Sequence, residues 1–182
     1  MKIYLVDSDV NNFQSLLLDD GERCRCGPMS FRCKPKLAAW EPPTVYSGSP
    51  LHEAGEFLDF CSSGAFAIAP RAMEKLHDIA AQAGELLQLP YEGQVFTVLN
   101  VLPAVDCLDR ERSKFYRKDS FHDIVDYAFL SERVPRISIF KIPETLLDIY
   151  AVERTGDPKT EFKAAVKHHG LTGLIFKQIW EG

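Results

Sequence analysis

Short extended segments recur along the chain, whereas helical periodicity occurs in only two stretches. Strand-like composition marks residues 2–6, 13–18, 44–47, 57–60, 65–69, 94–102, 137–142 and 174–180. The clearest of these is 94–102, where β-branched and aromatic residues indicate a buried strand. The segments do not alternate regularly with helices, which argues against a doubly wound parallel sheet. The sequence therefore predicts an α+β fold with a mostly antiparallel sheet.

Two helices are predicted to pack on this sheet. Pro70 suits a first helical position, apolar residues follow it at three- and four-residue spacing, and Gly84 stands where a C-terminal cap belongs. A second helix is predicted over residues 158–169, with Asp157 as its N-cap and Gly170 after its last turn.

The length of 182 residues is that of one domain, 1–182, although a distinct N-terminal subdomain over 1–55 stays open. Lys and Arg number 21 against 26 Asp and Glu, a net charge of −5, which argues against nucleic-acid binding. No apolar run approaches the roughly 20 residues of a membrane span. The N-terminus reaches Asp7 before a signal-peptide core can form. We expect a cytoplasmic protein, with a homo-oligomer left open.

Cysteine usage indicates reduced thiols. The five cysteines are Cys24, Cys26, Cys33, Cys61 and Cys107. An odd count without a secretory signal does not predict a disulfide framework. The spacing in the first three, C-x-C followed by six residues, differs from the C-x-x-C of a zinc knuckle, and a fourth ligand would have to be His52 or a distant residue. We expect no metal and no cofactor, and the role of the loop that carries these cysteines is left undecided.

No catalytic motif stands out. The sequence lacks the glycine-rich phosphate loops, the G-x-S-x-G elbow and H-E-x-x-H. Asp106 and Asp109 follow the strand at 94–102 and are candidates for acid–base work or cation binding. Because arginines and a lysine interleave with them, a solvated loop with ion pairs is the alternative. His168 and His169, at the end of the second helix, are explained by the helix dipole.

One group of carboxylates is a candidate surface for a partner. Residues 121–130 fit either a helix or a strand. If 119–127 is helical, Asp119, Asp123 and Asp126 share one face at spacings of four and three. Like charges on one face are mildly destabilising, so a basic partner would turn a small penalty into a gain. These three residues are the predicted partner-binding site, with tolerated surface as the alternative.

The order of several segments resembles a family of bacterial immunity proteins from polymorphic-toxin and contact-dependent competition systems. The likeness covers roughly residues 55–180, and Lys141 stands where the family pattern has arginine. The segments that carry it are Phe57-Leu58-Asp59-Phe60, Val95 to Leu102, Asp106-Cys107-Leu108-Asp109 with Ser113, Ile137-Ser138-Ile139-Phe140-Lys141, and Gly170-Leu171-Thr172-Gly173-Leu174-Ile175-Phe176.

This resemblance implies a protein that is not an enzyme. Such a protein binds the toxin made beside it and occludes the active site or another functional surface of that toxin. The implied partner is therefore a cognate toxin or secreted effector. Another protein-binding or scaffolding domain is one alternative, and a small enzyme that uses Asp106 and Asp109 is the other.

Overall fold

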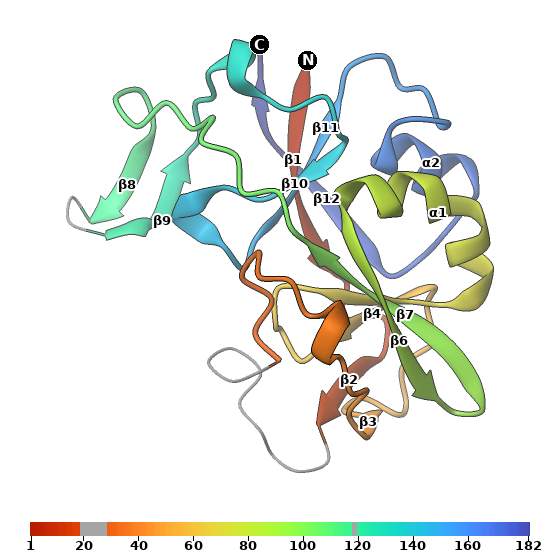
Figure 1. Ribbon diagram of the computed structural model, residues 1–182. Coiled ribbons are helices and arrows are strands. Elements are labelled where there is room, and N and C mark those ends of the chain that lie inside the picture. Colours follow the sequence, from red (N-terminus) through yellow and green to blue (C-terminus); the bar gives the residue numbers. More distant parts are fainter. Residues whose placement is uncertain (19–28, 118–119) are drawn as a thin grey trace.

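The fold is α+β, as the sequence predicts. The computed structural model describes residues 1–18, 29–117 and 120–182 of the chain (Figure 1). Within these ranges the chain forms twelve strands in three sheets, two α-helices and three short 3-10 turns. All strand pairs are antiparallel except that of β2 with β4.

The first sheet joins the two ends of the chain. Its strands, in spatial order, are β10 (Ile139–Phe140), β11 (Ile149–Glu153), β1 (Lys2–Ser8) and β12 (Leu174–Glu181). The N-terminal strand β1 thus lies between two strands from the last part of the chain. A bulge between Ile3 and Tyr4 shifts the register of β1 against β12. At the end of this pair, the N-terminal amino group donates a hydrogen bond to the Gly182 carbonyl at 2.7 Å.

The second sheet has six strands and carries most of the segments predicted as extended. In spatial order they are β3 (Val45–Ser47), β2 (Ser15–Leu18), β4 (Phe57–Phe60), β5 (Phe66–Ile68), β7 (Gln94–Val101) and β6 (Gly84–Tyr91). Strands β6 and β7 form a hairpin whose two turn residues, Glu92 and Gly93, both have positive φ, at 47° and 73°. Two consecutive positive φ values are characteristic of a type I′ turn, which matches the twist of the hairpin.

A small third sheet lies beside the first one. It pairs β8 (Lys114–Arg117) with β9 (Ser120–Asp126). The helical alternative for this region is therefore wrong, and the polar stretch before it contains a strand that the sequence did not indicate. Irregular register between β8 and β9 breaks the simple alternation that would have revealed the pair.

The two helices pack side by side between the larger sheets (Figure 1). Helix α1 (Pro70–Ala83) has the predicted bounds, but Gly84 is extended, with φ of 160°, and begins β6 directly instead of capping the helix. Helix α2 (Phe162–His168) begins four residues later than predicted. The Phe162 N–H is bound at 3.1 Å by the Ser138 hydroxyl, a cap from a distant segment. The Asp157 carboxylate instead binds the Lys159 N–H in the preceding turn.

Three apolar clusters form the core. The first lies between the four- and six-stranded sheets and contains the buried faces of both helices. Its centre is a group of contacting rings, among which Phe66 and Phe162 stack with centroids 6.0 Å apart. The second lies on the opposite face of the six-stranded sheet, and the third is between the four-stranded sheet and residues 105–142. Full burial of each such side chain contributes about 1.5–3 kcal/mol.

The helices are short. The longer, α1, has 14 residues, and among the residues described here no helix combines the length and the apolar character needed to cross a bilayer.

Candidate functional site

The segment predicted to present the partner-binding carboxylates on one helical face is a strand, β9, over residues 120–126. Asp119 lies outside the described residues. Asp123 and Asp126 belong to β9, so the helical period on which the prediction depended is absent there. The Asp126 carboxylate accepts a hydrogen bond from Lys114 Nζ at 2.8 Å. A role of these three residues in partner binding stays a prediction.

Asp106 and Asp109 are engaged in local ion pairs and turn hydrogen bonds. Asp106 lies 3.3 Å from the guanidinium of Arg110 and 3.8 Å from that of Arg133. The Asp109 carboxylate accepts the backbone N–H groups of residues 111 and 112, each at 3.1 Å. These partners favour the ion-paired loop over a carboxylate site.

Among the described residues, the cysteines and histidines form no cluster that could hold a metal. Cys24 and Cys26 lie outside the described residues. Cys61 and Cys107 are buried, and burial raises the pKa of the Cys107 thiol to about 12, which disfavours a thiolate nucleophile. His168 and His169 contact each other at the C-terminal end of α2. The parts of the chain that the structure describes contain no group of three His, Cys, Asp or Glu side chains placed to hold a metal.

Two of the segments that carry the family resemblance, 57–60 and 170–176, meet at the junction of the two larger sheets. Gly173, in the closing segment, has φ of 102° and packs against the backbone of Phe57, at the start of β4. The Phe57 N–H donates to the Thr172 carbonyl at 3.1 Å. The hydroxyl and the N–H of Thr172 both donate to the Glu56 carboxylate, at 2.7 and 2.9 Å. Residues 57–60 and residues 170–176 therefore hold each other in place.

Lys141, from a third such segment, joins three other stretches of the chain to one another. Its side chain is fully buried, and its ammonium group donates to the carbonyls of Phe31, Gly64 and Leu146 at 2.6, 2.6 and 3.0 Å. Burial lowers the pKa of Lys141 to about 8. A lysine with three carbonyl acceptors cross-links loops, so the segment is structural.

A groove lined by carboxylates lies beside this junction, between the two larger sheets. We call it the carboxylate groove. It has a volume of about 530 Å³, and its wall includes Asp7 on β1, Asp59 on β4 and Asp148 before β11. The exposed apolar side chains of Val10 and Ile175 also line it.

The electrostatics of the carboxylate groove penalise ionisation. Burial raises the pKa of Asp7, and the nearby Lys177 ammonium offsets part of that rise. Burial also raises the pKa of Asp148, and the Asp7 carboxylate adds to the rise, while a hydrogen bond from the Thr145 side chain and the Lys141 ammonium offset part of it. Asp59 is oriented by the strained turn after β4, where it accepts the N–H of Ser62, a residue with φ of 50°, at 2.9 Å. A lysine or arginine side chain of a partner would fit this groove: its charged end would relieve the repulsion between the carboxylates, and its aliphatic part would contact the apolar rim.

The sequence did not identify this groove. Its three carboxylates come from separate elements far apart along the chain. In the sequence, Asp7 stands out only as the acid that follows the first apolar residues and Asp59 only as part of the family pattern, and nothing singles out Asp148. No local spacing could have brought them together.

Comparison of the sequence with models of protein families finds no match, and comparison with curated proteins finds no significant match.

Proposed function

We propose that this protein is an immunity protein that binds one bacterial toxin and neutralises it by stoichiometric occlusion. The observation that carries the proposal is the junction described above. The segments on which the resemblance depends are remote in sequence, yet Gly173 lies against Phe57 and Lys141 ties the neighbouring loops. Residues that contact one another constrain each other's identity. A resemblance in several contacting segments therefore supports the family relationship more strongly than a resemblance in one segment.

The charge of the molecule supports a basic partner. The net charge is −5, and the carboxylate groove gathers three acidic side chains with an apolar rim. Complementary charge accelerates association and suppresses wrong partners. Neutralising a lethal enzyme requires a Kd near or below nanomolar, a binding free energy of roughly −12 kcal/mol. Such affinity usually comes from about 800 Å² of surface per partner, with a few residues as anchors.

The test is a titration of the toxin encoded by the adjacent gene. The purified protein is added to that toxin in increasing amounts, and residual toxin activity is measured. Occlusion follows mass action, so protection should reach its plateau near one equivalent when the concentration far exceeds Kd. The two proteins should also co-purify as a complex.

Two outcomes would contradict the proposal. Protection at a few per cent of an equivalent would indicate turnover and an enzyme, to be followed by replacing Asp106 and Asp109. A complete lack of binding and protection by a folded protein would indicate a scaffolding or other binding domain.

A further inference from the structure

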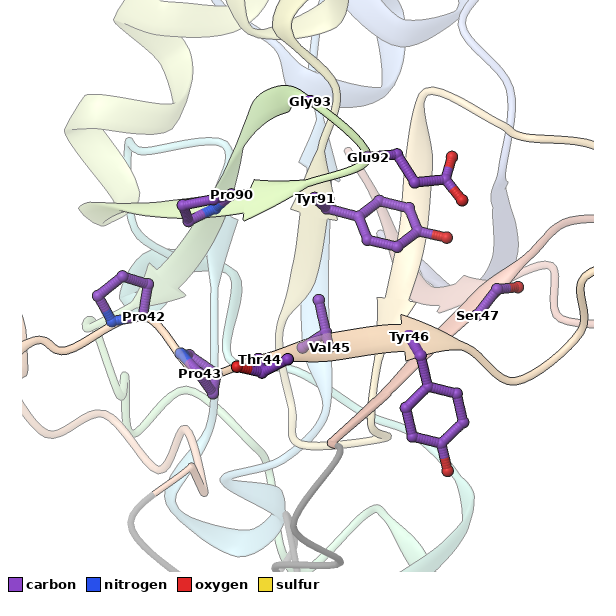
Figure 2. Close-up of a pocket in the computed structure, with 10 residues that line it drawn as sticks. All are labelled: Pro42, Pro43, Thr44, Val45, Tyr46, Ser47, Pro90, Tyr91, Glu92 and Gly93. Carbon is purple, nitrogen blue, oxygen red and sulfur yellow. The ribbon is translucent and has the colours of Figure 1, made fainter.

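A second groove lies at the opposite end of the six-stranded sheet from the helices. We call it the edge groove. It has a volume of about 580 Å³ and lies between β3 with the prolines that precede it, and the tip of the β6–β7 hairpin. Figure 2 shows β3 along one side of the groove, and Pro90, Tyr91, Glu92 and Gly93 along the other.

The two sides of this groove are the two edges of one sheet. The strand order is β3-β2-β4-β5-β7-β6, so β3 and β6 are the terminal strands. Both line the same groove, which means that the sheet curls until its edges face each other without pairing. The edge groove therefore occupies the position of a missing strand.

The backbone of β3 directs hydrogen-bonding groups into this space. The Gly48 N–H donates to the Ser15 carbonyl at 2.8 Å, so Gly48 and Ser15 form a hydrogen-bonded pair in the antiparallel ladder of β3 and β2. Because hydrogen-bonded and non-hydrogen-bonded pairs alternate, the N–H and C=O groups of Val45 and Ser47 point away from β2. Val45 and Ser47 line the groove, and within the described residues their backbone groups have no backbone partner.

Strand β6 does not pair with these groups. Pro90 lies on its free edge and has no N–H to donate. The neighbouring outward carbonyl, that of Gln88, already accepts a hydrogen bond from the Trp40 indole at 2.7 Å. The sheet thus has one edge partly blocked by proline and a side chain, and one edge, β3, whose outward donors and acceptors have no backbone partner in residues 1–18, 29–117 and 120–182.

We propose that the edge groove binds an extended segment of a partner protein, which adds to β3 as a further strand. Backbone donors and acceptors at alternate residues of an exposed strand are what strand addition requires, and side-chain pockets then give specificity. Pro42 and Pro43 provide an apolar wall beside β3. Glu92 is the one charged side chain among the described residues of the groove, so the added strand carries a basic residue there. This inference does not depend on the toxin.

The test uses a short synthetic peptide of alternating valine and lysine, blocked at both ends. Backbone amide signals of the isotope-labelled protein are followed by NMR during titration with the peptide. We expect saturable changes at Val45, Ser47 and Gly93. Two further peptides are N-methylated, one at its odd-numbered residues and the other at its even-numbered residues. Strand addition predicts that one version binds at least about tenfold more weakly and the other does not, because only one edge faces β3.

A pair of variants tests the same hydrogen bonds from the protein side. Val45→Pro removes the outward N–H at an edge position that tolerates proline, whereas Val45→Ala keeps it. We expect Val45→Pro to reduce the affinity for the unmethylated valine–lysine peptide by about tenfold, and Val45→Ala to change this affinity much less. A peptide with glutamate in place of lysine should bind more weakly than the parent.

Three results would overturn the inference. These are no signal changes at millimolar peptide, equal binding of the two N-methylated versions, or self-association of the protein that Val45→Pro abolishes. The last would assign the edge groove to a second copy of the chain. Since no toxin is used, none of these results bears on the proposed immunity function.

Discussion

Gly173 lies so close to Phe57 that a Cβ at position 173 would be 2.1 Å from the Phe57 carbonyl oxygen. The backbone of Gly173, with φ of 102°, is also in a region that other residues rarely adopt. Two independent reasons therefore require glycine at this position: a Cβ would clash with Phe57, and the backbone angle is unfavourable for other residues. The contact joins the closing segment to the six-stranded sheet.

The first prediction is that Gly173→Ala destabilises the protein by about 3 kcal/mol or more, since backbone strain and a clash with main-chain atoms add. Urea denaturation would measure it. Gly170→Ala is the matched control. Gly170 has φ of 60°, but a Cβ added there would meet nothing within 4 Å, so only the conformational penalty of about 1–2 kcal/mol applies. Equal losses in the two variants would show that the contact with Phe57 has no energetic role.

The second prediction concerns Lys141 and pH. The folded protein releases the Lys141 proton at a pKa of about 8, whereas an ordinary lysine keeps it to 10.5. Between these values the unfolded chain binds more protons, so stability rises with pH by roughly 3 kcal/mol through this group. The arginine in Lys141→Arg does not titrate in this range. The free energy of unfolding of the wild type, minus that of Lys141→Arg, should therefore increase from pH 7 to 10. A difference that is flat from pH 7 to 10 would contradict the prediction.

Removing the cation altogether has a different effect. Lys141→Met leaves the carbonyls of Phe31, Gly64 and Leu146 without their donor. Buried acceptors that lose a partner are costly, and we expect a loss of about 3–5 kcal/mol at pH 7. Thermal and urea unfolding would both report it.

The third prediction concerns Arg110, which donates from Nε to the buried Glu144 carboxylate at 2.6 Å. Arg110→Ala should destabilise the protein by about 1–3 kcal/mol, because it removes a charged partner from a buried group. Arg112→Ala is the control, since Arg112 is exposed and lies 4.0 Å from Asp109. That loss should stay below about 1 kcal/mol. A ranking of the two arginines in the opposite order would be evidence against a structural role for Glu144.

The fourth prediction separates stability from binding in the carboxylate groove. The pKa of Asp148 is raised in the folded protein, so ionisation near neutral pH opposes folding. Asp148→Asn should therefore raise the denaturation midpoint at pH 7, and the gain should shrink as the pH falls towards 4. The same variant should associate severalfold more slowly with a basic toxin, and high salt should reduce the deficit.

Asp78→Asn, on α1, makes the same charge change at a fully solvated side chain and is the matched control. It should alter neither the midpoint nor the association rate to a comparable extent. If Asp148→Asn lowers stability and leaves association unchanged, the groove carboxylates serve the fold and not a partner.

Local signals predicted the parts of the fold that depend on local chemistry. Helix α1 was found because proline and an apolar stripe lie within one stretch, and the strand at 94–101 was found from its β-branched residues. The start of α2 was missed because its cap is Ser138, more than twenty positions earlier. Strand β6 was missed because Gly84 passes from helix to strand without a loop, where the sequence suggested a cap.

The candidate sites were beyond local reasoning for a similar physical reason. The carboxylate groove exists only because β1, β4 and the residue before β11 converge, and the edge groove exists only because a sheet curls. The predicted acidic site depended on a helical period, which the β8–β9 pairing replaced. Periodicity within one segment contains no information on either event.

The position of β1 also sets when the protein can fold during its synthesis. β1 leaves the ribosome long before its two partners, β11 and β12, which lie beyond residue 148. At about 5–20 residues per second, the nascent chain therefore carries an unpaired apolar strand for many seconds. The four-stranded sheet closes only after residues 174–181 have emerged from the ribosome, so the protein cannot bind a partner through its sheet junction before that point.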